Sequence, residues 1–202
     1  YNGTITGFTT SYGAGVAVEP RSGGSFGLYG NAAIQHNKST NTGNLMQGGN
    51  YYPNSDLENV SGKSSAGGGG VANLGQFTMN SLRSDAIAYN SAARFGGGLY
   101  SYSEGGQYTD RWTKLLNGGI TGNTAGEQGG GVHASPNHSG TELTLGGSVS
   151  ITGNTLTDGT DENLYLLVDT EYGASAKISV SGLTEDCLLY TSPSPRDKRQ
   201  SR

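Results

Sequence analysis

The sequence predicts an all-β fold, a single-stranded parallel β-helix (a solenoid) of about six coils. The main observation is an internal repeat: Ile120–Val132 reads ITGNTAGEQGGGV, and Ile87–Leu99 reads IAYNSAARFGGGL, 33 residues earlier. Repeats with a period of 20–50 residues are typical of solenoids and related arrays. The chain contains six isoleucines, and five of them occupy the same position of this repeat. We therefore expect each copy to form one coil.

Two motifs define each copy, an Ile-x-x-Asn strand and a glycine-rich stretch that ends in a β-branched or leucine residue. The Ile and Asn positions, with two weaker copies included, are Ile5/Phe8, Ile34/Asn37, Val60/Lys63, Ile87/Asn90, Ile120/Asn123 and Ile151/Asn154. The glycine-rich stretches are Gly13–Val16, Gly67–Val71, Gly96–Leu99 and Gly129–Val132. Because Phe8 and Lys63 replace asparagine, we expect the two N-terminal coils to be less regular.

Three short segments in each copy alternate apolar and polar residues, as half-buried strands do. No copy contains the apolar stripe of a helix. Strands of successive coils would stack about 4.8 Å apart. The asparagines should then form a ladder of amide hydrogen bonds, each contributing about 1 kcal/mol. The glycines should supply positive φ at the corners.

The last segment of the chain differs from the repeats. Cys187–Asp197 reads CLLYTSPSPRD and resembles the translation of a transposase sequencing adapter. We therefore predict a β-helix domain over residues 1–186, truncated at its ends, followed by a non-native, disordered tail over 187–202. The alternative is a genuine disordered basic tail.

Excluding this tail changes the composition that bears on function. Residues 1–186 hold 8 basic and 15 acidic residues, a net charge of −7, and no cysteine. A chain of this kind offers no disulfide, no thiolate nucleophile and no cysteine metal site, and it does not favour nucleic acid as a partner. It contains no apolar run of about 20 residues that would span a membrane.

The Gly-Gly-Gly-Val stretches, the Gly-Asn-Thr turns at 122–124 and 153–155, and the closing segments Asn163–Leu166 and Lys177–Val180 resemble one known group. They are similar to glycine-rich right-handed β-helix proteins of bacterial surfaces, which include autotransporter passengers, polymorphic outer-membrane-protein-like repeats and adhesins. The resemblance implies an extracellular or cell-surface protein, outer-membrane-attached or wall-attached, without catalysis or cofactor. It would bind a glycan or a host surface protein through loops. A purely structural repeat is a further alternative.

The best candidate binding residues are the aromatic side chains of the insertion Tyr100–Trp112, namely Tyr100, Tyr102, Tyr108 and Trp112. Exposed tyrosine and tryptophan are enriched at recognition sites because they bury a large area at little entropic cost. The alternative is that these rings cover the apolar side of the coil.

The second functional hypothesis is a secreted polysaccharide lyase or glycoside hydrolase, because such enzymes also use β-helices. It requires converging acidic and basic groups. Asp85, Asp110, Glu104 and Glu127 are instead dispersed, although Asp110-Arg111 beside Trp112 could act on a sugar. Asp158, Asp161 and Glu162 could hold a cation, but we expect a solvated turn. We expect His133 and His138 to be exposed and not to bind metal, because a third ligand is missing.

Overall fold

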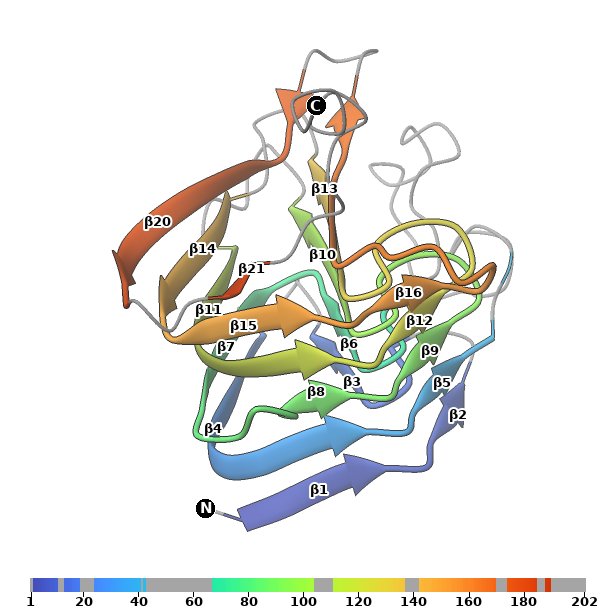
Figure 1. Ribbon diagram of the computed structural model, residues 1–202, viewed down its shortest axis with the longest axis horizontal. Helices are drawn as coiled ribbons and strands as arrows, with labels where there is room; N and C mark the ends of the chain where they lie inside the picture. The colour runs from blue at the N-terminus through green and yellow to red at the C-terminus, as the bar shows by residue number, and fades with distance from the viewer. Residues whose placement is uncertain are drawn as a thin grey trace, which may run out of the picture.

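The computed structural model describes residues 2–10, 13–18, 24–40, 42, 67–103, 111–136, 142–169, 174–184 and 188–189 of the 202-residue chain. These residues form strands and turns and no helix, as the sequence predicts. Most of the strands lie in three parallel sheets. Within each sheet, successive strands stack from the N-terminus upward in Figure 1.

Each sheet takes strands from along the whole described chain. The first sheet consists of β1 (Asn2–Thr6), β4 (Ser25–Gln35), β7 (Gln76–Ser81), β8 (Ile87–Ala88), β11 (Trp112–Thr121), β14 (Glu142–Gly147), β15 (Val149–Thr152), β20 (Lys177–Leu183) and β21 (Leu188–Leu189). The second consists of β3 (Val16–Val18), β6 (Val71–Asn73), β10 (Leu99–Ser103), β13 (Val132–Pro136) and β17 (Leu164–Leu166). The third consists of β2 (Thr9–Thr10), β5 (Lys38–Ser39), β9 (Ser91–Ala92), β12 (Thr124–Ala125) and β16 (Thr155–Leu156).

The chain passes through these sheets in a fixed order, first, third and second, and then returns to the first. All pairs within the three sheets are parallel, and the antiparallel pair is β18 (Val168–Asp169) with β19 (Ala174–Ser175). β21 belongs to the segment that the sequence analysis excludes from the domain, and it pairs with β15, with Leu189 opposite Ile151. The other residues of 187–202 lie outside the described residues.

The isoleucine positions coincide in register across the first sheet, as the repeat predicts. Ile34 lies opposite Ile5 on one side and Ile87 on the other, and Ile120 lies between Ile87 and Ile151. All but the half-buried Ile5 are fully buried in one continuous apolar core with leucine and valine of the second sheet. This core runs along the whole stack.

The predicted coil at Val60/Lys63, between those of Ile34 and Ile87, is wrong. Ile34 pairs directly with Ile87, so the Val60/Lys63 copy does not lie between them. Val60 and Lys63 themselves lie outside the described residues. The asparagine ladder likewise passes from Asn37 to Asn90, whose Oδ1 accepts Nδ2 of Asn37 at 3.0 Å. Lys63 therefore does not interrupt the ladder.

The glycine-rich stretches are needed because they pack against the ladder. The glycine three residues before the closing valine or leucine of each stretch has positive φ, for example +61° at Gly96 and +66° at Gly129. The glycine directly before the valine or leucine packs against the ladder asparagine. A Cβ placed on Gly98 would lie 2.9 Å from both Nδ2 of Asn123 and Cγ2 of Ile120. The two motifs therefore occur together because the backbone at one must approach the side chains of the other closely.

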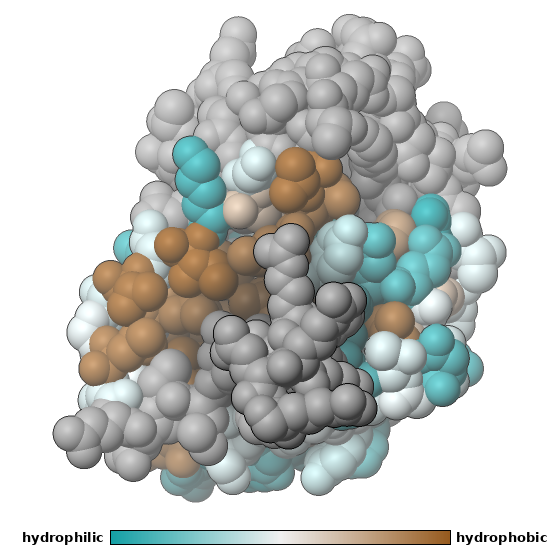
Figure 2. Space-filling view, turned by 45° about the horizontal axis from the view of Figure 1, so that its top comes forward, coloured by the Kyte–Doolittle hydropathy of each residue, from teal (hydrophilic) through white to brown (hydrophobic). Residues whose placement is uncertain are grey.

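The C-terminal end of the stack presents apolar side chains. Figure 2, in which the top of Figure 1 is turned forward, shows apolar residues gathered on this end. Val180 and Leu183 of β20 are both exposed, Val180 by 64%. β20 pairs with β14 and has no further neighbour among the described strands.

Candidate binding site

The structure places three of the four predicted binding residues. Tyr100 and Tyr102 lie in β10, Trp112 begins β11, and Tyr108 lies outside the described residues. Tyr100 is 2% exposed and Tyr102 is 4% exposed. The expectation of an exposed aromatic loop is therefore wrong for these two rings. They agree with the alternative interpretation, in which the rings cover the coil.

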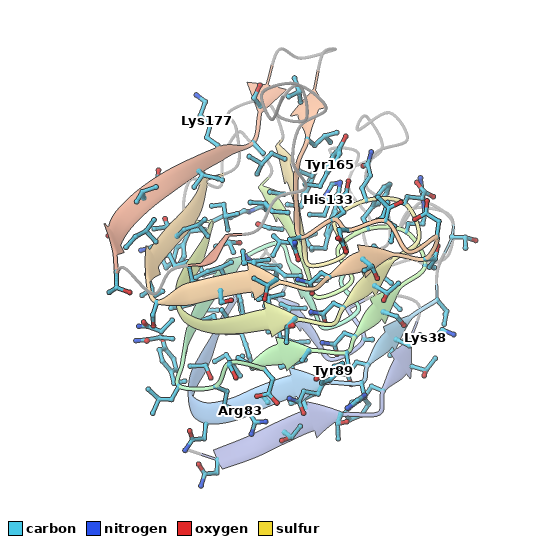
Figure 3. All side chains as sticks on the ribbon, in the orientation of Figure 1. Lys38, Arg83, Tyr89, His133, Tyr165 and Lys177 are labelled. Carbon is cyan, nitrogen blue, oxygen red and sulfur yellow. The ribbon has the colours of Figure 1, made fainter. Side chains whose placement is uncertain are left out.

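The buried rings belong to a column on the outer face of the second sheet. Tyr100 lies opposite His133 of β13, and His133 lies opposite Tyr165 of β17. The centroids of Tyr100 and His133 are 5.4 Å apart, and those of His133 and Tyr165 are 5.3 Å apart. Figure 3 shows His133 and Tyr165 side by side at the upper end of this sheet. The three rings thus stack from coil to coil.

Alternation along the strands explains why this column lies outside the main core. Leu99 and Val132 point inward and join the core, so the next residues, Tyr100 and His133, point outward. Tyr100 instead joins a second apolar cluster with Ala72, Leu74 and Tyr102, against which Phe95 packs. Stacked aromatic pairs contribute about 0.5–1.5 kcal/mol each beyond the area that they bury. The outer face of the second sheet is therefore stabilised by its own small core.

His133 is buried, which corrects the expectation that it is exposed. It is 2% exposed, and its Nε2 lies 3.2 Å from Oε1 of Gln128. Its ring packs against Phe95 at a centroid distance of 4.9 Å. Burial lowers the pKa of His133 to about 3, so the ring is neutral at pH 7. His133 is therefore a packing residue, and its partner in the prediction, His138, lies outside the described residues.

Of the three predicted binding residues that the structure describes, Trp112 is partly open to solvent. Its ring is half-buried, and Nζ of Lys114 lies 4.7 Å from the ring centroid. Lys114 is exposed at the next outward position of β11. A cation over an indole ring is a favourable arrangement. Trp112 and Lys114 together can offer an aromatic surface and a positive charge to a ligand.

Asp85 and Glu127 have separate arginine partners on separate segments of the chain. Asp85 forms an ion pair with Arg83 at 2.8 Å and also accepts Nε2 of Gln35, and the Arg83 hydrogen bond lowers the pKa of the Asp85 carboxyl. Glu127 forms an ion pair with Arg94, between Oε1 and Nε, at 2.7 Å. Each of these two carboxylates is therefore held by an arginine. Asp110 and Glu104 lie outside the described residues.

Two acidic side chains of the segment after β16, Asp158 and Glu162, accept backbone hydrogen bonds. Asp158 accepts the backbone N–H of Thr160 at 2.9 Å, which lowers the pKa of Asp158. Glu162 accepts the backbone N–H of Gly129 in the neighbouring coil. Across the part of the chain that the structure describes, no three histidine, cysteine, aspartate or glutamate side chains are grouped so as to hold a metal ion.

Comparison of the chain with protein-family models, with curated proteins and with solved structures finds no match. Within the described ranges, no helix has the length and apolar character needed to cross a membrane.

The sequence analysis missed one exposed aromatic pair. His36 and Tyr89 each follow an isoleucine of the first sheet by two residues, and their rings stack on each other. The other coils have glycine at this position, at Gly7, Gly122 and Gly153. Two aromatic residues in a column of glycines are the signal that could have revealed them.

Proposed function

We propose that residues 1–186 form a right-handed parallel β-helix that serves as a non-catalytic, adhesin-like stalk of an exported surface protein. It would bind a glycan or a host surface protein through side chains and loops on its outside. The resemblance of its repeats to bacterial surface proteins supports an extracellular or cell-surface location.

The observation that carries this proposal is the continuous ladder of buried asparagines. Asn37, Asn90, Asn123 and Asn154 are buried, and each donates its backbone N–H and its Nδ2 to Oδ1 of the next ladder residue. Oδ1 of Asn163 accepts the last two of these hydrogen bonds, both from Asn154, and ends the ladder. Hydrogen bonds of this kind, repeated from Asn37 to Asn154, hold these coils in register. A rigid stack on which the outward side chains vary is suited to recognition.

The dispersal of the acidic groups favours binding over catalysis. A glycoside hydrolase needs two carboxyl groups about 5–9.5 Å apart around one bond. Asp85 and Glu127 are instead held in ion pairs with Arg83 and Arg94. An enzyme on this scaffold would need such groups to converge on one face.

The experiment is a binding and cleavage assay on the purified chain. The immobilised chain is exposed to an array of oligosaccharides, and in parallel it is incubated with neutral and acidic polysaccharides whose chain lengths are followed by size-exclusion chromatography. Binding without shortening of the polysaccharides is the expected result. Shortening would instead establish the lyase or hydrolase alternative, and the absence of both activities would favour a protein partner or a purely structural repeat. The variant Trp112→Ala tests whether the partly open surface of Trp112 and Lys114 contributes to this binding.

A further inference from the structure

The corner between the first and third sheets has left-handed backbone geometry in each coil whose corner the structure describes. The residue two positions after each isoleucine has φ of +78° at Gly7, +63° at Gly122 and +65° at Gly153. At the same corner His36 has φ of 55° and Tyr89 has φ of 56°. They are the two non-glycine residues with positive φ among the described residues. Side chains with a Cβ are unfavourable in this geometry, and glycine adopts it freely.

This geometry is enforced on both sides of the two residues. The backbone N–H groups of His36 and Tyr89 donate to the carbonyl oxygens of Ala88 and Thr121, each at 3.2 Å. The next residue in each case, Asn37 or Asn90, is a buried member of the ladder. The corner cannot relax without breaking the ladder. Glycine would satisfy this geometry better, so backbone geometry does not explain why the two rings are present.

The two rings form one exposed platform. Their centroids are 5.2 Å apart and their planes are 14° from parallel. Tyr89 is 53% exposed, and His36 is also exposed. The Tyr89 ring also extends over the next corner, because a Cβ placed on Gly122 would lie 2.7 Å from its Cδ1 and Cε1. The platform is therefore fixed in position before any ligand arrives, and such preorganisation favours binding.

Hydroxyl groups surround the platform on the third sheet. The outward residues in register there are Thr9, Lys38, Ser91, Thr124 and Thr155. Figure 3 shows Tyr89 and Lys38 at the same side of the stack. The same register position of the first sheet holds Thr6, Gln35, Ala88, Thr121 and Thr152, and Gln35 donates to Asp85. Apart from the rings, the side chains on both sides of the corner are small, polar or positively charged.

We propose that His36 and Tyr89 form a carbohydrate-binding subsite. A sugar ring has an apolar C–H face that can lie against an aromatic ring, and its hydroxyls can bond to the flanking threonines and serine. The spacing of about 4.8 Å between coils is close to the length of one sugar unit, so a glycan running along the stack meets one polar side chain of the third sheet, a hydroxyl or Lys38, at each coil. Lys38 can contact an acidic substituent. A protein partner would need a larger apolar centre than these two rings provide.

The test compares the full chain with the double variant His36→Gly/Tyr89→Gly. Glycine already occupies this corner in three other coils, so the variant should fold, and circular dichroism and a melting curve check this. His36→Asn/Tyr89→Asn is the second variant, because asparagine also tolerates this geometry. The matched control is Tyr29→Ser, which removes a tyrosine of β4 that is 48% exposed. The probes are oligosaccharides of glucose, galactose, N-acetylglucosamine and uronic acids, followed by calorimetry.

We expect the double variant to lose at least about tenfold in affinity, as for removal of an aromatic anchor, and Tyr29→Ser to bind as the wild type. This inference rests on the proposed function, and the outcomes separate the two. A wild type that binds a sugar, with both double variants binding equally well, overturns the subsite and leaves the proposed function standing. A wild type that binds none of the probes overturns the subsite and the glycan part of the proposed function together.

Discussion

Asn90 and Asn123 are 33 residues apart in the chain, yet Nδ2 of Asn90 donates to Oδ1 of Asn123 at 3.0 Å. The backbone N–H of Asn90 donates to the same oxygen at 2.9 Å. Asn123 repeats the arrangement with Asn154, and its Nδ2 also donates to the carbonyl of Ile87. Each asparagine therefore binds the coil on either side of its own.

Replacing Asn123 by alanine should strongly destabilise the protein. The change leaves the buried N–H of Asn90 without its acceptor and removes one of the two acceptors of its Nδ2, and a buried unsatisfied group costs about 1–3 kcal/mol. We expect the free energy of unfolding to fall by about 3 kcal/mol or more, measured by urea denaturation.

The matched control is Asn80→Ala. Asn80 is exposed, and its Oδ1 accepts one hydrogen bond, from Nδ2 of Asn117. The free energy of unfolding should change by about 0.5 kcal/mol or less. Similar losses for both variants would show that the ladder does not hold the coils together.

A methyl group on Gly97 should be far less tolerated than one on Gly3. The Cβ of alanine at 97 would lie 2.4 Å from the carbonyl oxygen of Gly130 and 2.5 Å from that of Thr124, and both are backbone atoms of the next coil. Nothing lies within 4 Å of a Cβ on Gly3. We expect Gly97→Ala to cost about 3 kcal/mol, as overpacking does, or to prevent folding. Gly3→Ala should shift the melting temperature little, and equal melting temperatures would contradict the close packing of the corners.

The core positions could be predicted from the sequence because stacking repeats the same contacts at the same positions. Ile87 and Ile120 occupy the same position of the repeat in the sequence, and they lie opposite each other in the first sheet. The number of coils could not be predicted so well. Val60 and Lys63 only loosely match the isoleucine and asparagine of the repeat, and they lie in a polar stretch, so they are a weak signal. The structure pairs Ile34 with Ile87 instead.

The candidate site was harder to predict, because the sequence does not show what covers an outward position. Tyr100 and His133 alternate with core residues, which would normally place them in solvent. They are buried because rings at equivalent positions of adjacent coils stack on each other and on Phe95. Tyr89 escaped notice because its importance depends on its φ of 56°, which only the glycines at the same position of other coils indicate in the sequence.

Stability should fall as the pH is lowered from 7 to 5, and His133 should account for part of the loss. In the unfolded chain histidine takes up a proton near pH 6.5, whereas burial lowers the pKa of folded His133 to about 3. Below pH 6.5 the unfolded state therefore binds more protons, which lowers the free energy of unfolding by up to about 1.4 kcal/mol per pH unit. His133→Phe keeps a ring in the stack and removes this titration.

The measurement is urea denaturation of wild type and His133→Phe at pH 7 and pH 5, above the range in which most carboxylates titrate. The variant should lose about 2 kcal/mol less than the wild type over this interval. Parallel pH dependence in wild type and His133→Phe would show that the buried ring accepts a proton without cost.

Tyr89→Gly should leave the stability of the protein within about 1 kcal/mol of the wild type. Glycine relieves a left-handed backbone strain of about 1–2 kcal/mol, and it forfeits ring stacking of about 0.5–1.5 kcal/mol with His36. Glycine also adds freedom to the unfolded chain, worth about 0.5–1 kcal/mol. Tyr100→Ala, in the buried column of the second sheet, should instead cost about 3–5 kcal/mol. Thermal melting of the two variants checks the contrast. A large loss at Tyr89 would mean that its ring is retained for packing, which would remove the main reason for assigning it to a ligand.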